Sequence, residues 1–226
     1  MSSTLLVLYD LLLAEYGRQH WWPASSPFEV IVGAILTQAV NWKSVEKSIA
    51  ALKKADLLSQ EGLAKAKEEE IAPLIRPCIY YNQKAAKLKA FVRFLEEKHD
   101  GNLHELLAVP AMQLRRELLQ VKGIGQETAD SIVLYAADQA SFVIDAYTKR
   151  ILLRLSLIDE KARYSKIRQM FMEAIPEKAD LYKDYHALFV RHAKERCRAR
   201  RPLCVGCPLN SMCDSPLKRK APDAGH

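Results

Sequence analysis

The sequence lacks the features of a membrane or secreted protein. No run of apolar residues reaches the roughly 18–20 residues that a membrane-spanning helix needs. The apolar residues at the N-terminus follow no basic segment, and Asp10 and Glu15 interrupt them, so they do not form a signal peptide. We therefore expect a soluble intracellular protein with no membrane partner.

The sequence also lacks strands, internal repeats and low-complexity segments. Val143-Ile144 is the only hint of extended chain and is too short for a strand of a sheet. Elsewhere apolar residues recur at the i, i+3, i+4 spacing of amphipathic helices, which predicts an all-α fold of about ten helices. The expected helices are 4–16, 28–36, 45–52, 63–75, 83–98, 112–119, 127–137, 146–155, 163–175 and 181–192. The tail from Pro216 is expected to fray.

Acidic residues are outnumbered by basic ones. Lys and Arg total 34 and Asp and Glu 27, so the 226-residue chain has a net charge of +7, which weakly favours a polyanionic partner. The apolar fraction of 49% is typical of a globular protein and excludes a chain disordered throughout. Six basic residues lie in 191–201, and such a run forms either a solvated face or a phosphate-binding surface.

Cysteine is scarce outside one short segment. Cys78 stands alone and is expected to be a buried thiol. The other four follow the spacing Cys-x6-Cys-x2-Cys-x5-Cys, as Cys197, Cys204, Cys207 and Cys213. Four thiolates this close in sequence suit either a zinc ion or a [4Fe–4S] cluster, and the spacing alone does not choose between them.

Residues 118–130 predict two helices joined by a tight turn at Gly123-Ile124-Gly125. The glycines allow positive φ and leave backbone amides accessible to a phosphate, and Ile124 is expected to pack back between the helices. An ordinary corner between two helices has the same local pattern. Asp145 comes twenty residues after Gly125 at the start of a helix, where an aspartate is most simply an N-cap.

The hairpin, Asp145 and the cysteines together resemble the helix–hairpin–helix, Gly/Pro-rich, aspartate superfamily of DNA glycosylases, the endonuclease III group. Val121-Lys122 precedes the first glycine, where the family more usually has Leu-Pro. The resemblance implies that Asp145 is the catalytic carboxylate and that Lys122, Gly123, Ile124 and Gly125 bind DNA. It also implies that the four cysteines, with Pro208 after the third, hold a structural [4Fe–4S] cluster.

The same resemblance implies two helical domains with an active-site cleft between them. One would be a six-helix barrel with the hairpin, at 27–135, and the other an iron–sulfur cluster domain, from 1–26 and 136–226. The implied partner is double-stranded DNA containing damaged bases. The expected protein is a monomer of the prokaryotic cytoplasm, associated with the nucleoid.

Glu127 marks a departure from the bifunctional members of this family. Those members attack the sugar with a lysine two positions after the second glycine, where this chain has Glu127. A carboxylate cannot form a Schiff base. We therefore expect a monofunctional glycosylase, in which Asp145 assists a water and stabilises an oxocarbenium-like sugar without cleaving the strand.

Further segments are similar to 3-methyladenine DNA glycosylase III, a branch of the superfamily, over most of residues 20–195. They are Trp21-Trp22-Pro23, Pro27-Phe28-Glu29, Gly33 to Gln38, Trp42 and Arg76 to Ala85. The branch implies a base pocket lined by Trp21, Trp22, Pro23 and Trp42, with Gln38 as the wedge that replaces the flipped nucleotide. Indoles favour a cationic base by roughly 0.5–2 kcal/mol. The alternative is that the tryptophans only pack in the core or on the surface.

Lys194 lies where this branch has a pocket lysine that can be carbamylated. Carbamylation would turn a cation into an anion, which suits a cationic base. A lysine in a basic run is equally suited to bind phosphate or to face solvent.

The sequence thus predicts a monofunctional DNA glycosylase of base excision repair that flips and excises alkylated purines such as 3-methyladenine. One alternative is an endonuclease III-like glycosylase for an oxidised or mismatched pyrimidine. The others are a non-catalytic DNA-binding helical module and a zinc-binding helical protein. Asp145 and the aromatic residues argue against a non-catalytic module.

Overall fold

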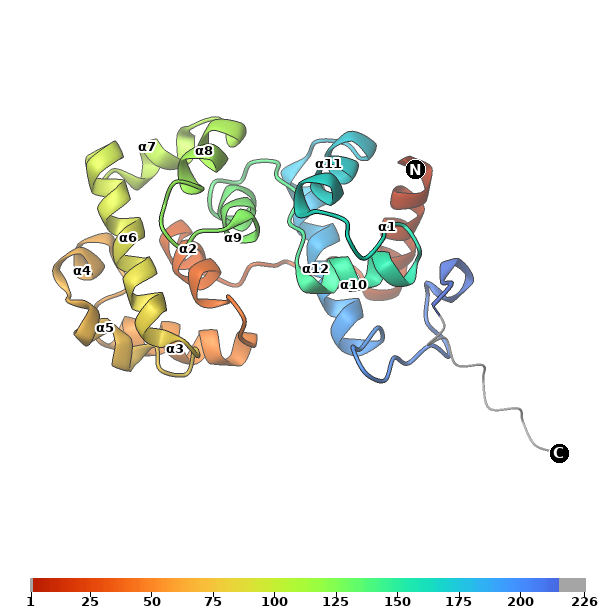
Figure 1. The fold of residues 1–226 in the computed structure, drawn as a ribbon, viewed down its shortest axis with the longest axis horizontal. Coiled ribbons are helices and arrows are strands. Elements are labelled where there is room, and N and C mark those ends of the chain that lie inside the picture. Colours follow the sequence, from red (N-terminus) through yellow and green to blue (C-terminus); the bar gives the residue numbers. More distant parts are fainter. Residues whose placement is uncertain (1, 216–226) are drawn as a thin grey trace. The chain divides into compact units, whose positions relative to one another are not determined.

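The protein, described here by a computed structural model of residues 2–215, is built from helices (Figure 1). These residues form twelve α-helices, a π-helical segment and a short 3-10 helix, with no strand, so the all-α prediction is confirmed. None of these helices has the length and apolar character that a membrane span requires. The chain divides into two compact units, residues 22–141 and residues 2–21 with 142–215. The tail from Pro216 lies outside the described residues.

The unit of residues 22–141 is built around α2 (Pro27–Leu36). This helix is apolar on nearly all sides and is buried from Phe28 to Leu36. It begins after Ser26, whose side chain accepts a hydrogen bond from the Glu29 amide, with Pro27 at the first helical position. The elements that pack against α2 are α3 (Trp42–Lys54), α6 (Tyr81–His99), α9 (Gln126–Ser131) and the π-helical segment Ile132–Ala136.

Four shorter helices complete this unit: α4 (Gln60–Lys65), α5 (Glu68–Leu74), α7 (Leu103–Ala108) and α8 (Ala111–Leu118). The single helix predicted over 63–75 is wrong, because the chain is extended at Ala66 and a new helix starts at Glu68. At that start the Lys67 amide donates to the Glu70 carboxylate at 2.7 Å. The spacing hid the break because Leu63 and Ile71, on either side of it, are both fully buried.

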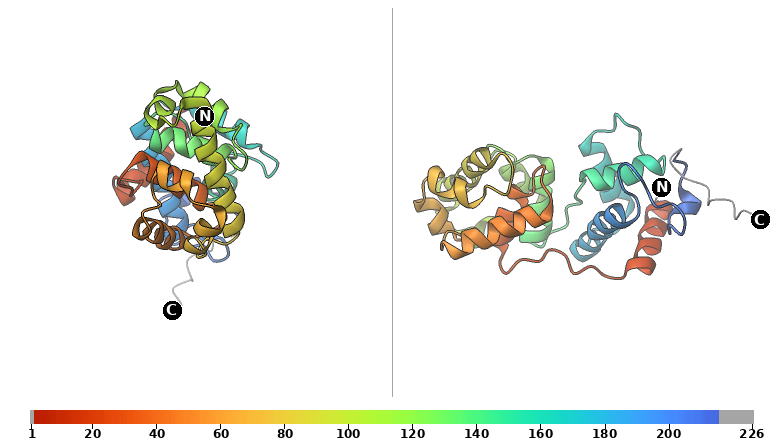
Figure 2. Two further views of the ribbon diagram at one scale, coloured as in Figure 1. Left: turned by 90° about the vertical axis from the view of Figure 1, so that its left-hand side faces the viewer. Right: turned by 90° about the horizontal axis from the view of Figure 1, so that it is seen from below.

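The second unit combines both ends of the described chain. It contains α1 (Ser2–Tyr16), α10 (Ala146–Arg154), α11 (Tyr164–Ala174), α12 (Ala179–Glu195) and the 3-10 helix Asn210–Met212. Helix α1 packs on α11 and α12, and the right-hand view of Figure 2 shows α1 next to α12. The core is aromatic: Phe142 stacks on Phe171 with ring centroids 3.9 Å apart, and the Tyr185 hydroxyl donates to the Leu5 carbonyl at 2.7 Å.

Candidate functional site

The turn between α8 and α9 forms a tight hairpin. Gly123 has a φ of +92°, and a Cβ at this position would collide with the side chain of Lys87, so only glycine fits. Gly125 precedes α9 with extended backbone, and nothing lies within 4 Å of its Cβ position. Ile124 is buried as predicted, whereas Lys122 and both glycines are exposed. The turn therefore presents its backbone to solvent while one apolar side chain anchors it.

Gln38, which follows α2, is hydrogen-bonded to this hairpin. Its Nε2 donates to the Gly123 carbonyl at 3.1 Å and to the Thr128 hydroxyl at 3.0 Å, and its Oε1 accepts from Lys87 Nζ. The structure thus brings the predicted wedge and the predicted DNA-binding turn together. Sequence reasoning missed Lys87, because nothing in its own segment shows that its side chain reaches a turn some 35 residues later.

Trp22 and Trp42 lie together in the same unit, with a third ring from Tyr135. The Trp22 centroid is 5.3 Å from that of Trp42 and 5.3 Å from that of Tyr135. Trp22 also covers Gly33 on α2, where a Cβ would lie 3.3 Å from the indole. We call Trp22, Trp42 and Tyr135 the aromatic group. Tyr135 was not predicted, because its only signal was one aromatic residue within the apolar run Ile132–Ala136.

The other pocket candidates and Glu127 lie outside the aromatic group. Trp21 is half-buried and is the last residue of the segment 2–21, which belongs to the other unit. Pro23 is exposed in the loop after Trp22. Lys194 is exposed on α12, with Nζ 6.0 Å from the ring centroid of Tyr147. Glu127 is exposed in the first turn of α9.

Asp145 is the N-cap of α10. Its Oδ1 accepts from the Thr148 amide at 2.7 Å, and its Oδ2 lies 3.5 Å from Nε2 of His186 on α12. Burial by itself would raise the pKa of this carboxyl, but the nearby His186 ring, followed by the contacts with Thr148, outweighs burial and lowers the pKa below its usual value. Asp145 therefore caps its helix and also presents an ionised carboxylate.

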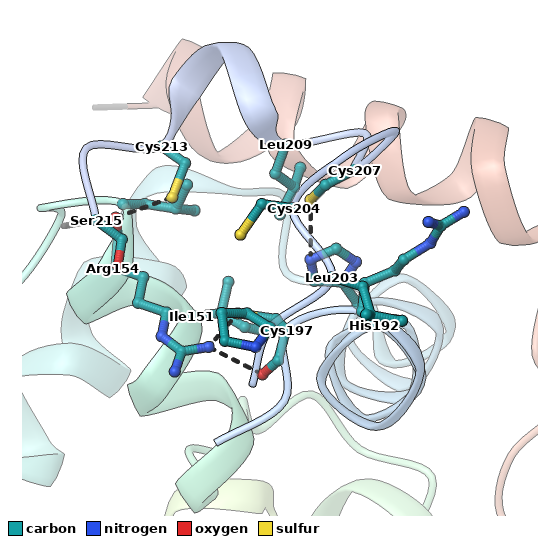
Figure 3. Close-up of a pocket in the computed structure, with 13 residues that line it drawn as sticks. Ile151, Arg154, His192, Cys197, Leu203, Cys204, Cys207, Leu209, Cys213 and Ser215 are labelled. Carbon is teal, nitrogen blue, oxygen red and sulfur yellow. Dashed lines mark hydrogen bonds between the residues drawn. The ribbon is translucent and has the colours of Figure 1, made fainter. Parts of the chain in front are cut away.

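The four cysteines of the C-terminal loop line one pocket, together with residues of α10 and α12 (Figure 3). Within residues 2–215, no three His, Cys, Asp or Glu side chains are arranged to hold a metal ion. Cys78, in contrast, is fully buried in the other unit, as predicted. Its sulfur lies 3.3 Å from the Ser48 hydroxyl.

Arg154 and His192 lie beside cysteines of this pocket (Figure 3). Arg154 donates to Cys197 Sγ at 3.1 Å, and His192 Nε2 lies 3.8 Å from Cys207 Sγ. Burial above all lowers the pKa of His192 to about 4, so its ring is neutral near pH 7. The Tyr16 hydroxyl lies 2.9 Å from Nδ1, so both ring nitrogens of His192 have a polar neighbour.

The sequence model of the HhH-GPD superfamily base excision DNA repair proteins matches residues 32–177, a range that includes Gln38, the hairpin and Asp145. The chain belongs to this superfamily. It is 47% identical, over 91% of its length and 94% of the relative, to a candidate DNA repair glycosylase of Methanocaldococcus jannaschii. The resemblance to the helix–hairpin–helix DNA glycosylase superfamily is therefore confirmed, and the protein is a DNA glycosylase of base excision repair.

Two solved structures are similar to this fold. An endonuclease III–DNA complex matches with a TM-score of 0.82 at 21% identity, over 95% of both chains. The 3-methyladenine DNA glycosylase of H. pylori, bound to 1,N6-ethenoadenine, matches with a TM-score of 0.71 at 26% identity, over 86% of this chain and 97% of that one. Both similarities extend over most of the chain rather than over one motif.

Proposed function

We propose that this glycosylase is monofunctional and excises alkylated purines such as 3-methyladenine from double-stranded DNA. The aromatic group carries the proposal, because it brings three electron-rich rings together. The Trp22 ring centroid lies 5.3 Å from that of Trp42 and 5.3 Å from that of Tyr135. Cation–π attraction to such rings stabilises a bound cationic purine by roughly 0.5–2 kcal/mol, and a neutral base lacks this attraction. The similarity to a 3-methyladenine DNA glycosylase bound to a modified adenine supports this substrate class.

In this proposal each site residue has a defined task. Lys122 and the backbone of Gly123 and Gly125 hold the phosphate backbone, while Gln38 fills the space left by the flipped nucleotide. Asp145 supplies a carboxylate that stabilises positive charge on the sugar and orients the attacking water. The alkylated base already carries positive charge, so it leaves with little help from a general acid. Lys194, as a carbamate, would attract the cationic base.

Glu127 supports the absence of strand cleavage. It occupies the position of the lysine that bifunctional members use, and a carboxylate cannot form the Schiff base that β-elimination requires. Borohydride should therefore trap no covalent adduct between the protein and its DNA substrate.

The test is incubation with alkylated duplex DNA, with base release and strand cleavage scored separately. We expect free 3-methyladenine without strand breaks. Asp145→Asn should abolish base release and leave DNA affinity nearly unchanged, whereas Asp159→Asn, an exposed residue of the same unit, should retain full activity. Base release by the Asp145→Asn variant, or release of oxidised pyrimidines only, would reject the proposal.

We also infer that Cys197, Cys204, Cys207 and Cys213 hold a [4Fe–4S] cluster with a structural role. Their shared pocket supports this, and so does the Arg154 donor, because N–H groups stabilise thiolate sulfur. A bound cluster would organise a loop that has little core of its own. Purified protein should absorb at about 400 nm, and Cys204→Ser should remove that band. A protein that contains zinc and lacks the band would reject the cluster.

A further inference from the structure

His186 is a buried histidine that the reaction described above does not use. It lies on α12 with 6% of its surface exposed, between the buried residues Tyr185 and Ala187. Its Nε2 is 3.5 Å from Oδ2 of Asp145. Because α10 and α12 pack against each other, this contact joins the start of α10 to the middle of α12.

The two oxygens of Asp145 have separate partners. Oδ1 accepts a hydrogen bond from the amide of Thr148 in the first turn of α10. Any aspartate at the N-cap position can make this bond. Oδ2 faces His186, a contact that capping does not require. The side chain of Asp145 is 13% exposed, so Oδ2 is enclosed by protein on most sides. The second contact therefore lies at the oxygen that the capping hydrogen bond does not use.

We propose that His186 is a positioning residue for the glycosylase reaction, which holds Oδ2 of Asp145 while the Thr148 amide holds Oδ1. The proposal rests on the proposed catalytic role of Asp145. A carboxylate stabilises a developing sugar cation best when it is already oriented, and a displacement of about 1 Å can cost roughly 100-fold in rate. The lowered pKa of Asp145 agrees with this role, since His186 is the main group that opposes the effect of burial.

Three variants on α12 separate positioning from general packing. His186→Leu removes the nitrogen donor, His186→Gln keeps an N–H donor, and Leu188→Ala opens the core on the same helix without changing the pair. The measurements are the single-turnover rate of base release with enzyme in excess, DNA affinity, and the midpoint of thermal unfolding.

We expect His186→Leu to lower the single-turnover rate roughly 100-fold, with DNA affinity within about threefold of wild type. His186→Gln should recover most of that rate. Leu188→Ala should lower the unfolding midpoint but release base at nearly the wild-type rate at temperatures where it is folded. A His186→Leu rate within about twofold of wild type, or equal losses in the Leu and Gln variants, would overturn the proposal.

A second measurement does not depend on enzymatic activity. The unfolding free energies of Asp145→Asn, His186→Leu and the double variant form a cycle that isolates the interaction of the pair. We expect the double variant to lose less stability than the sum of the single variants. Additive losses would reject the pairing. If the wild-type protein released no base, the proposed function would fail, and the cycle would still decide whether the two side chains interact.

Discussion

At the scale of single residues, Glu127 offers the simplest chemical test of the reaction type. Replacing it by lysine places an amine at the exposed first turn of α9. We expect Glu127→Lys to yield a borohydride-trappable adduct and some strand cleavage, because an amine can attack the sugar where a carboxylate cannot. Glu127→Gln should keep base release and form no adduct. Equal trapping in the Gln and Lys variants would show that another nucleophile acts.

Residues that act locally were predictable, and residues that act across the fold were not. Asp145 was predicted as an N-cap from the residues around it, and the structure has that cap. Tyr135 and Lys87 gave no such signal, because their roles depend on which helix faces them. The contact of His186 with Asp145 joins positions 41 residues apart, and no periodicity in the sequence encodes such a pairing.

At the scale of elements, the hairpin contains a matched pair of glycines. Gly123→Ala forces a side chain into φ +92° and against Lys87, so we expect it to lose about 1–2 kcal/mol or more of unfolding free energy and to weaken DNA binding. Gly125→Ala, at φ −93° with open space around it, should change stability by no more than about 0.5 kcal/mol. Urea unfolding measures both, and equal losses would contradict the assigned strain.

Local sequence signals, such as capping residues and apolar composition, explain which helices were predicted well. The α10 boundary at Ala146 follows from its capping residue, and α2 follows from its Ser-Pro start and apolar composition. Helix α7 was missed because six residues are too few to show a period. The helix predicted over 127–137 proved to be α9 followed by a π-helical segment, a change of winding that side-chain spacing does not reveal.

For the whole molecule, acid should weaken the fold. Burial alone would raise the pKa of Glu29, but bonds from Ser25 and from Lys53, whose Nζ is 2.9 Å away, lower it below 4.5. The pKa values of Glu117 and Asp145 are lowered as well. Carboxyls with lowered folded pKa values contribute stability above their unfolded pKa and lose it as pH falls through the folded value.

Unfolding free energy should therefore decline as pH falls below roughly 4.5, and less steeply in Glu29→Gln than in wild type. Urea titrations from roughly pH 3 to 7 measure this, with Glu61→Gln, an exposed glutamate of the same unit, as the control. An identical slope in Glu29→Gln and wild type would show that this carboxyl does not contribute.

The charge of the whole molecule should appear in the salt dependence of DNA binding. Within the basic run, Arg191 donates to the Tyr16 carbonyl and to Glu195, and Arg200 and Arg201 are exposed. We expect Arg200→Ala and Arg201→Ala each to reduce the slope of log K against log salt by about one, for damaged and undamaged DNA alike. Lys161→Ala, exposed elsewhere in the same unit, should leave the slope unchanged, and unchanged slopes in the arginine variants would exclude phosphate contacts there.

The packing of α1 against α11 and α12 has a consequence for synthesis on the ribosome. Residues 22–141 are contiguous, so their core can close as soon as they emerge. Helix α1 emerges before this unit, yet Leu5, Leu8 and Leu12 are nearly inaccessible in the finished protein, where α1 packs on α11 and α12, which are made after it. At roughly 5–20 residues per second this delay lasts roughly 7 to 30 seconds. Helix α1 is therefore translated before the unit of residues 22–141 but buried after it, and the nascent chain carries an apolar face that chaperones can bind throughout that interval.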